Sequence, residues 1–151
     1  ALPICAEADR ADRTHTFDTA FLDRTFTRID QSIAMAALFA AHHMRASAIV
    51  SLTQSGSTAL WITRIDSGIP VYALTPEESS RRRMTLFREC HPVAMQYRSY
   101  DMPAVLADVE RLMLENGLVK NGDLVVITVG EPVGKSGGTN NLKIVRIGSH
   151  S

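Results

Sequence analysis

Cysteine is scarce in this chain of 151 residues, which contains only Cys5 and Cys90. Two thiols do not make a disulfide framework, and neither has a His or a second Cys at metal-ligand spacing, so we expect both to be inert. No apolar run approaches the roughly 18 residues that a membrane-spanning helix needs, and the pattern of a secretory leader is also missing. These absences favour a cytoplasmic protein with no membrane partner.

Net charge is absent as well, because 16 Lys and Arg residues balance 16 Asp and Glu residues. A neutral surface has no long-range attraction for nucleic acid, so we expect no nucleic-acid partner. The three arginines at 81–83 fan around a predicted helix, which is more typical of a solvated face or a subunit contact. The adjacent His42 and His43 point in different directions on a helix, and we therefore expect no metal site.

A starting methionine is also missing, since the chain begins at Ala1 and its first methionine is Met35. Residues 1–29 mix Asp with Arg and lack both glycine and a sustained hydrophobic period, which predicts a linker. Residues 30–151 are regularly patterned and long enough for one self-sufficient domain. Ala1 is then either the first residue after removal of an initiator methionine or the start of a fragment of a longer chain.

From residue 30 onward, helix-type and strand-type segments alternate. Asp30 is a candidate N-cap for the first helix, and Pro92 is expected to end the third. We expect helices over 31–45, 59–66, 76–90 and 102–116, and strands over 48–52, 70–74, 93–97, 124–129 and 142–148. Helical crossovers predict parallel strands, whereas the last connection is only a loop. The pattern therefore predicts a three-layer α/β/α sandwich with four parallel strands and an antiparallel last strand at the sheet edge.

One candidate binding site is the turn after the first strand, which is rich in hydroxyl groups. Its residues are Thr53, Gln54, Ser55, Gly56, Ser57 and Thr58. Hydroxyls, backbone N–H groups and the start of the next helix together suit an anion such as a phosphate monoester. The same composition is typical of a simple N-cap turn, and the local sequence leaves both interpretations open. Ser55 does not lie in a Gly-x-Ser-x-Gly elbow, so no nucleophilic serine is predicted.

A second candidate is the glycine-rich loop after the fourth strand. Its central residues are Gly134, Lys135, Ser136, Gly137 and Gly138. The stretch 130–136 superficially resembles a nucleotide-binding P-loop, but it has three residues instead of four between its glycines and precedes a strand, not a helix. We interpret the loop as a flexible lid in which Lys135 is a mobile cation. No pair of carboxylates has a spacing suited to acid–base chemistry, so we expect no catalytic residue.

Six segments, in order, resemble the C-terminal domain of pyruvate kinase. They lie at 32–37, 48–50, 53–59, 69–75, 122–130 and 138–140, so the resemblance covers most of residues 30–147. In that family the domain is a three-layer α/β/α sandwich with a mixed five-stranded sheet of order 3-2-1-4-5, whose last strand is antiparallel. This order places the turn 53–58 and the loop 130–140 on the two sides of one crevice.

The resemblance implies a regulatory and oligomerisation domain that has no catalytic residues of its own. Pyruvate kinase transfers phosphate from phosphoenolpyruvate to ADP in glycolysis, with Mg²⁺ and K⁺ on its catalytic barrel, so no cofactor is expected in residues 1–151. Residues 1–29 would lead out of that barrel, which is the domain's first partner. The crevice would bind a phosphorylated effector under the lid. The family's tetramers imply homotetramer assembly, and we predict dimer contacts through strand 142–147.

One position departs from the family pattern. Many relatives carry Arg or Lys where Ser57 stands, and the segment 98–101 lacks residues that hold a second phosphate in some of them. The departure favours a sugar monophosphate or AMP over a bisphosphate as the effector. It is also compatible with a domain that binds no effector at all. The alternative is a free-standing α/β phospho-ligand-binding protein or a small phosphosugar enzyme, which would require a base or nucleophile near Ser55 that the sequence does not offer.

Overall fold

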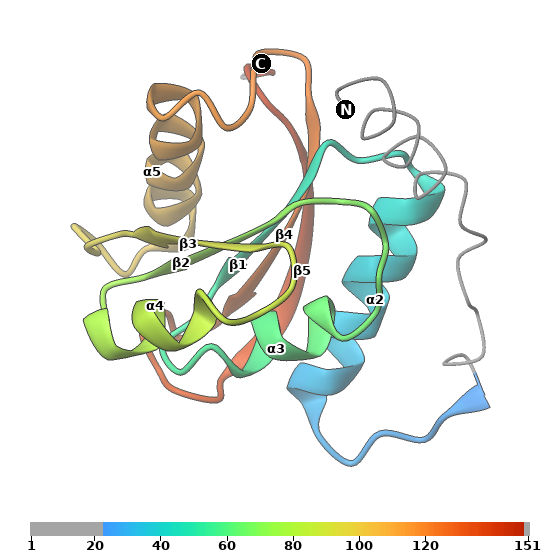
Figure 1. Cartoon of the computed structure of the whole chain (residues 1–151). Coiled ribbons are helices and arrows are strands. Elements are labelled where there is room, and N and C mark those ends of the chain that lie inside the picture. The colour runs from blue at the N-terminus through green and yellow to red at the C-terminus, as the bar shows by residue number, and fades with distance from the viewer. Residues whose placement is uncertain (1–22, 150–151) are drawn as a thin grey trace, which may run out of the picture.

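The computed structural model describes residues 23–149, which form one five-stranded sheet with helices on both sides (Figure 1). The strands are β1 (Ala48–Leu52), β2 (Val71–Thr75), β3 (Cys90–Ala94), β4 (Leu124–Gly130) and β5 (Thr139–Arg146). The helices are α2 (Ile29–His43), α3 (Ser57–Thr63), α4 (Glu78–Met84) and α5 (Met102–Glu115). The strand order is β3-β2-β1-β4-β5, which confirms the predicted order 3-2-1-4-5.

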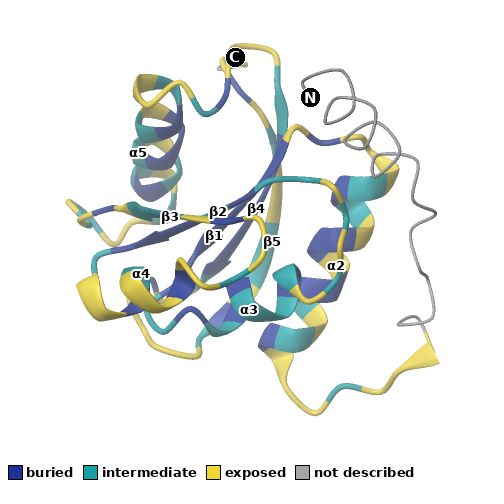
Figure 2. Cartoon of the chain, viewed as in Figure 1, coloured by how far each residue is buried: buried dark blue, intermediate teal, exposed yellow. Residues whose placement is uncertain are grey.

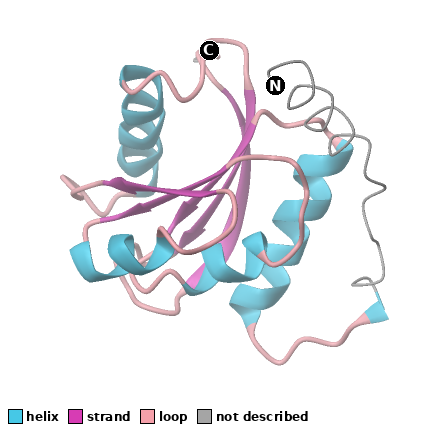
Figure 3. Ribbon diagram, in the orientation of Figure 1, coloured by secondary structure: helices cyan, strands magenta, loops and turns pink. Residues whose placement is uncertain are grey.

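The helices form a layer on each face of the sheet, with α2, α3 and α4 on one side and α5 on the other (Figure 3). Leu38 of α2 packs with Ile49 and Val126 on the first face, and all three are fully buried. On the second face, Val109 of α5 packs with Ile127. Successive side chains of a strand point to opposite faces, so a central strand between two helical layers is buried on both faces and mostly apolar. All five residues of β1 are buried accordingly (Figure 2).

The directions of the strands follow from their connections. β1 to β4 run parallel and are joined through helices, whereas β5 follows β4 through a loop without a helix and runs antiparallel to it. This confirms the predicted antiparallel edge strand. In the parallel β1–β4 pair, Ser51 lies opposite Thr128. The C-terminal ends of β1 and β4 are therefore neighbours, and the segments that leave them start from the same edge of the sheet.

The region between α4 and β3 differs from the sequence prediction. α4 ends at Met84, well before residue 90, and Pro92 lies inside β3 instead of ending a helix. β3 is an edge strand that pairs only with β2, and proline is tolerated there because one side of the backbone needs no partner. Cys90 is buried opposite Val71, so burial against β2 starts the strand earlier than its local pattern suggests.

The bounds of α3, β5 and α2 also differ from the sequence prediction. α3 starts at Ser57, before the expected range 59–66, and ends at Thr63. β5 starts at Thr139, before the expected 142–148, because its pairing with β4 extends to Gly130. Asp30 is not the N-cap of α2: Arg28 has that position, and Asp30 lies in the first helical turn.

The predicted linker over 1–29 lies mostly outside the described residues. Within residues 23–149, no helix has the length and apolar character needed to cross a lipid bilayer.

Candidate functional site

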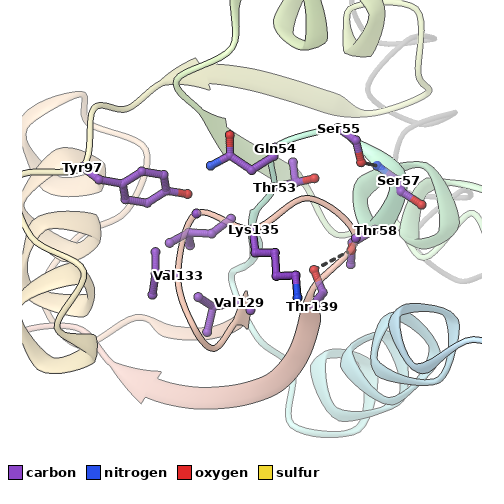
Figure 4. A pocket seen from close by; sticks show the side chains of 14 residues that line it. Thr53, Gln54, Ser55, Ser57, Thr58, Tyr97, Val129, Val133, Lys135 and Thr139 are labelled. Atoms are coloured by element: carbon purple, nitrogen blue, oxygen red, sulfur yellow. Dashed lines mark hydrogen bonds between the residues drawn. The ribbon is translucent and has the colours of Figure 1, made fainter.

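The turn 53–58 and the loop 130–138 meet at one crevice, beyond the C-terminal ends of β1 and β4 (Figure 4). From the predicted turn, the lining includes Thr53, Gln54, Ser55, Ser57 and Thr58. From the predicted lid, it includes Gly134, Lys135 and Gly137. Three further predicted residues do not line it: Gly56, Ser136 and Gly138. The structure thus brings the two candidate loops together, as the strand order led us to expect.

The crevice is nearly closed. It contains about 10 Å³ of open space, which is roughly what one water molecule needs. In Figure 4 the side chain of Lys135 extends from the loop toward Thr139, across the mouth of the turn. A phosphate group is larger than this space.

The turn depends on a left-handed residue at its centre. Gly56 has φ of 83°, a conformation that side chains of L-residues rarely adopt, and its N–H donates to Oγ1 of Thr53 over 2.8 Å. A Cβ atom at this position would lie 3.0 Å from Cγ of Met84 in α4. Glycine therefore shapes the turn from behind, although it does not line the crevice.

Helix α4 holds the outer side of the turn. The hydroxyl of Ser80 donates to the carbonyl oxygen of Gln54 over 2.7 Å, and the guanidinium of Arg83 donates to that of Ser55 over 2.5 Å. Among the described residues, the backbone N–H groups of Gln54, Ser55 and Thr58 have no acceptor. The carbonyl groups of Gln54 and Ser55 are therefore engaged by α4, whereas three N–H donors of the turn are uncommitted.

The loop contributes the only charged side chain among the described residues that line the crevice. This is Lys135, which makes no ion pair within residues 23–149. The loop packs against Tyr100, since a Cβ atom at Gly134, where φ is 88°, would lie 3.0 Å from the tyrosine ring. Lys135, which makes no ion pair within the described part of the chain, thus lines the same crevice as the turn with its uncommitted N–H donors.

Tyr97 lines the crevice and was not among the predicted site residues. It follows β3, whose end lies on the same sheet edge as those of β1 and β4. Burial raises the pKa of Tyr97, and its hydrogen bond with Gln54 opposes that rise. Its ring centroid lies 6.0 Å from that of Tyr100. The position of Tyr97 after a strand was the available signal, but the sequence-based assignment of β3 to 93–97 placed it inside the strand.

A second pair that sequence reasoning missed lies behind Ser57. The hydroxyl of Ser57 donates to Oδ2 of Asp30 over 3.2 Å, and the guanidinium of Arg28 donates to both oxygens of the same carboxylate. The contact joins the starts of α2 and α3, which are far apart in the sequence. No local sequence pattern predicts this contact.

The chemistry of the crevice favours binding over catalysis. Among the described residues that line it, none is a carboxylate, an imidazole or a thiol. Residues 23–149 contain no group of three His, Cys, Asp or Glu side chains that suits a metal ion. Cys90 is buried beside β2, and burial raises the pKa of its thiol to about 11, so it stays protonated at neutral pH.

The fold and the crevice together define a class: a three-layer α/β/α domain with a hydroxyl-rich turn facing a glycine-rich loop. The family model of the pyruvate kinase alpha/beta domain matches residues 31–145, and the chain belongs to this family. It is 33% identical to pyruvate kinase II of Salmonella typhimurium over 127 residues, which is 83% of this chain and 26% of that protein.

Other pyruvate kinases show similar coverage. Identity is 31% over 145 residues with the enzyme of Buchnera aphidicola subsp. Baizongia pistaciae, which is 95% of this chain and 30% of that protein. Identity with pyruvate kinase of Staphylococcus aureus is 34% over 138 residues, or 91% of this chain and 22% of that protein. The chain thus spans about a quarter of the length of these curated relatives.

Proposed function

We propose that this chain is the C-terminal regulatory and assembly domain of a pyruvate kinase, and that its crevice binds a phosphorylated effector. The whole enzyme would transfer phosphate from phosphoenolpyruvate to ADP. The observation that carries the effector role is the meeting of the turn 53–58 with Lys135 across one crevice. Uncommitted N–H groups and hydroxyls bind phosphate oxygens well, and a mobile ammonium group adds charge once the loop closes over the ligand.

The proposed ligand carries one phosphate. The crevice has one turn of this kind and one charged lining residue, Lys135, among the described residues. Arg98, on the stretch after β3, is not part of the lining. A second phosphate would find no matching set of donors, so a sugar monophosphate or AMP fits better than a bisphosphate.

The metal ions of the reaction belong elsewhere in this proposal. The whole enzyme would use Mg²⁺ and K⁺, but the described residues offer no cluster of oxygen or nitrogen ligands that fits either ion. The catalytic part of the protein would hold both ions.

Assembly would involve the edge strand β5. Its exposed residues include Lys143 and Ile144, which point to opposite faces of the sheet, and Ile144 has 42% of its surface accessible. An unpaired strand edge is a template for a strand of another copy. We propose that residues 142–147 make the dimer contact of a homotetramer.

Calorimetric titration tests the effector proposal. We expect the chain to bind glucose 6-phosphate, ribose 5-phosphate or AMP more tightly than fructose 1,6-bisphosphate. The variant Lys135→Ala should weaken the binding about tenfold, because it removes one charge-assisted hydrogen bond. Lys120→Ala is the matched control, since Lys120 is exposed and lies away from the crevice. Tightest binding of the bisphosphate, or equal losses in both variants, would contradict the proposal.

A further inference from the structure

The hydroxyl of Ser57 has a single hydrogen and already donates it. Its acceptor is Oδ2 of Asp30, 3.2 Å away, although Ser57 itself lines the crevice. The dianion of a phosphate monoester and an ionised carboxylate are both acceptors only, so neither can supply the hydrogen of a bond with the other or with Ser57. A phosphate that binds the hydroxyl of Ser57 must therefore replace Asp30 as the acceptor of this hydrogen bond.

The carboxylate of Asp30 also opposes an anion through its charge. Its side chain is only 2% exposed, and buried charges are screened much less by salt than surface charges. The carboxylate sits directly behind a residue of the phosphate turn, one hydrogen bond away. Taken alone, Asp30 would lower the affinity of the crevice for any negatively charged ligand.

Arg28 offsets this charge. Its Nε donates to Oδ1 of Asp30 over 3.0 Å and its Nη2 to Oδ2 over 2.7 Å, a two-pronged pair that fixes the carboxylate. The hydrogen bond and the charge of Asp30 raise the pKa of Arg28, so the guanidinium remains charged. The same Nη2 lies 3.4 Å from Oγ of Ser57, which brings the positive charge to the edge of the crevice.

Arg28 also has donors left over. Its side chain is 53% exposed, and its Nη1 has no acceptor among residues 23–149. A guanidinium offers five N–H groups in a rigid fork, so it can hold Asp30 on one side and a phosphate oxygen on another. Lysine at this position could not keep both contacts in the same geometry.

We propose that Asp30 and Arg28 set the anion affinity of the crevice in opposite directions. Asp30 lowers the affinity by holding the hydrogen of Ser57 and by its charge, whereas Arg28 raises it by neutralising Asp30 and by donating to the ligand. This inference rests on the proposed function, since it concerns the same crevice. Arg28 and Asp30, which lie outside the turn, would then determine how tightly the crevice binds an anion.

The test is a double-mutant cycle on the full chain, titrated with ribose 5-phosphate at about pH 8, where its phosphate is a dianion, and followed by the amide NMR signals of residues 54–58. Asp30→Asn keeps the shape of the side chain and should tighten the binding about tenfold. Arg28→Gln should weaken it by a similar factor, and the double variant should return close to the original affinity. Arg82→Gln is the control, because Arg82 pairs with Glu78 on the exposed side of α4 and should change the binding less than about twofold.

Two further variants separate the causes. In a Ser57→Ala background the gain from Asp30→Asn should shrink, because no hydroxyl hydrogen remains to be released. Arg28→Lys should recover only part of the affinity lost in Arg28→Gln, since it restores the charge without the fork. Melting temperatures near that of the original chain identify variants that remain folded, and Asp30→Asn, whose predicted effect is a gain, cannot be mimicked by misfolding.

The outcomes distinguish the two proposals. Binding by the original chain together with unchanged affinity in Asp30→Asn would overturn the role of Asp30 and Arg28 and leave the proposed function intact. Binding by Asp30→Asn alone would support the inference, since it would show that Asp30 suppresses the site. Absence of binding in every variant would overturn both proposals.

Discussion

Thr58 donates a hydrogen bond to Thr139 through their hydroxyl groups, which lie 2.8 Å apart although 81 positions separate them in the sequence. Thr58 belongs to the first turn of α3, and Thr139 is the first residue of β5. Both residues are buried, with 2% and 6% of their surface accessible. The bond ties the turn side of the crevice to the start of β5, where the loop ends.

The first prediction concerns this tie. Thr58→Val keeps the shape of the side chain but leaves the hydroxyl of Thr139 buried without its donor, which should cost about 1–3 kcal/mol of unfolding free energy. The double variant Thr58→Val/Thr139→Val removes both polar groups and should recover most of that loss. Urea denaturation measures the three values. A double variant that loses the sum of the single losses would show that the bond does not couple the two residues.

The second prediction concerns Gly56. Gly56→Ala forces a side chain into a left-handed backbone conformation and against Met84, so it should destabilise the chain by about 2–4 kcal/mol. Gly68→Ala is the matched control, because Gly68 has φ of 69° but nothing within 4 Å of the added Cβ atom. The control should lose only the backbone contribution, about 1 kcal/mol. Equal losses in thermal or urea unfolding would show that Met84 does not restrict the turn.

The third prediction concerns the pH dependence of stability. Burial raises the pKa of Cys90 to about 11 from its ordinary value of 9.0. The folded state therefore holds the thiol proton more tightly, and the resulting stability is complete below pH 9 and lost as the pH rises toward 11. The variant Cys90→Ala should show a shallower decline of unfolding free energy between pH 9 and pH 11, by roughly 2 kcal/mol over the range. Parallel curves for the two proteins would contradict this.

The fourth prediction concerns the edge strand β5. Ile144→Asp places a charge on the exposed side of the strand proposed to pair between copies, so association should weaken by at least tenfold. Leu86→Asp is the control, since Leu86 is an even more exposed apolar residue, at 86%, and lies after α4. Sedimentation or light scattering over a range of concentrations gives the association constants. Loss of association in Leu86→Asp alone would contradict the proposed contact through β5 and would indicate an interface near α4.

Much of the fold could be predicted because it follows from the local hydrophobic pattern of the sequence. The apolar run of β4 requires cover on both faces, and the alternation in β5 indicates an edge, and both predictions are confirmed by the sheet. The same local reasoning was wrong at Pro92, which lies in a strand. Proline is a reliable signal against a helix interior, but only the position of β3 at the sheet edge explains why a strand tolerates it.

The candidate site was predictable in part for the same reason. The turn 53–58 and the loop 130–138 have compositions that suggest binding, and each follows a strand, so their residues could be proposed from the sequence. Whether they bind a phosphate stays a prediction. Tyr97, Asp30 and Arg28 were not predicted to act at the site, because their roles depend on distances between segments that local sequence does not encode.

The sequence by itself determined the alternation of helices and strands, the burial of the central strands and the two loops with binding chemistry. These features arise from hydrophobic period and from residues that constrain the backbone, such as Gly56, and both act over a few residues. The tertiary structure decided what those loops face. The order of strands brought Lys135 to the turn, and the packing of α2 beside α3 set Asp30 behind Ser57. Hydrogen bonds form only at contact distance and charge interactions weaken as the separation grows, so which groups meet was decided when the sheet and helices assembled.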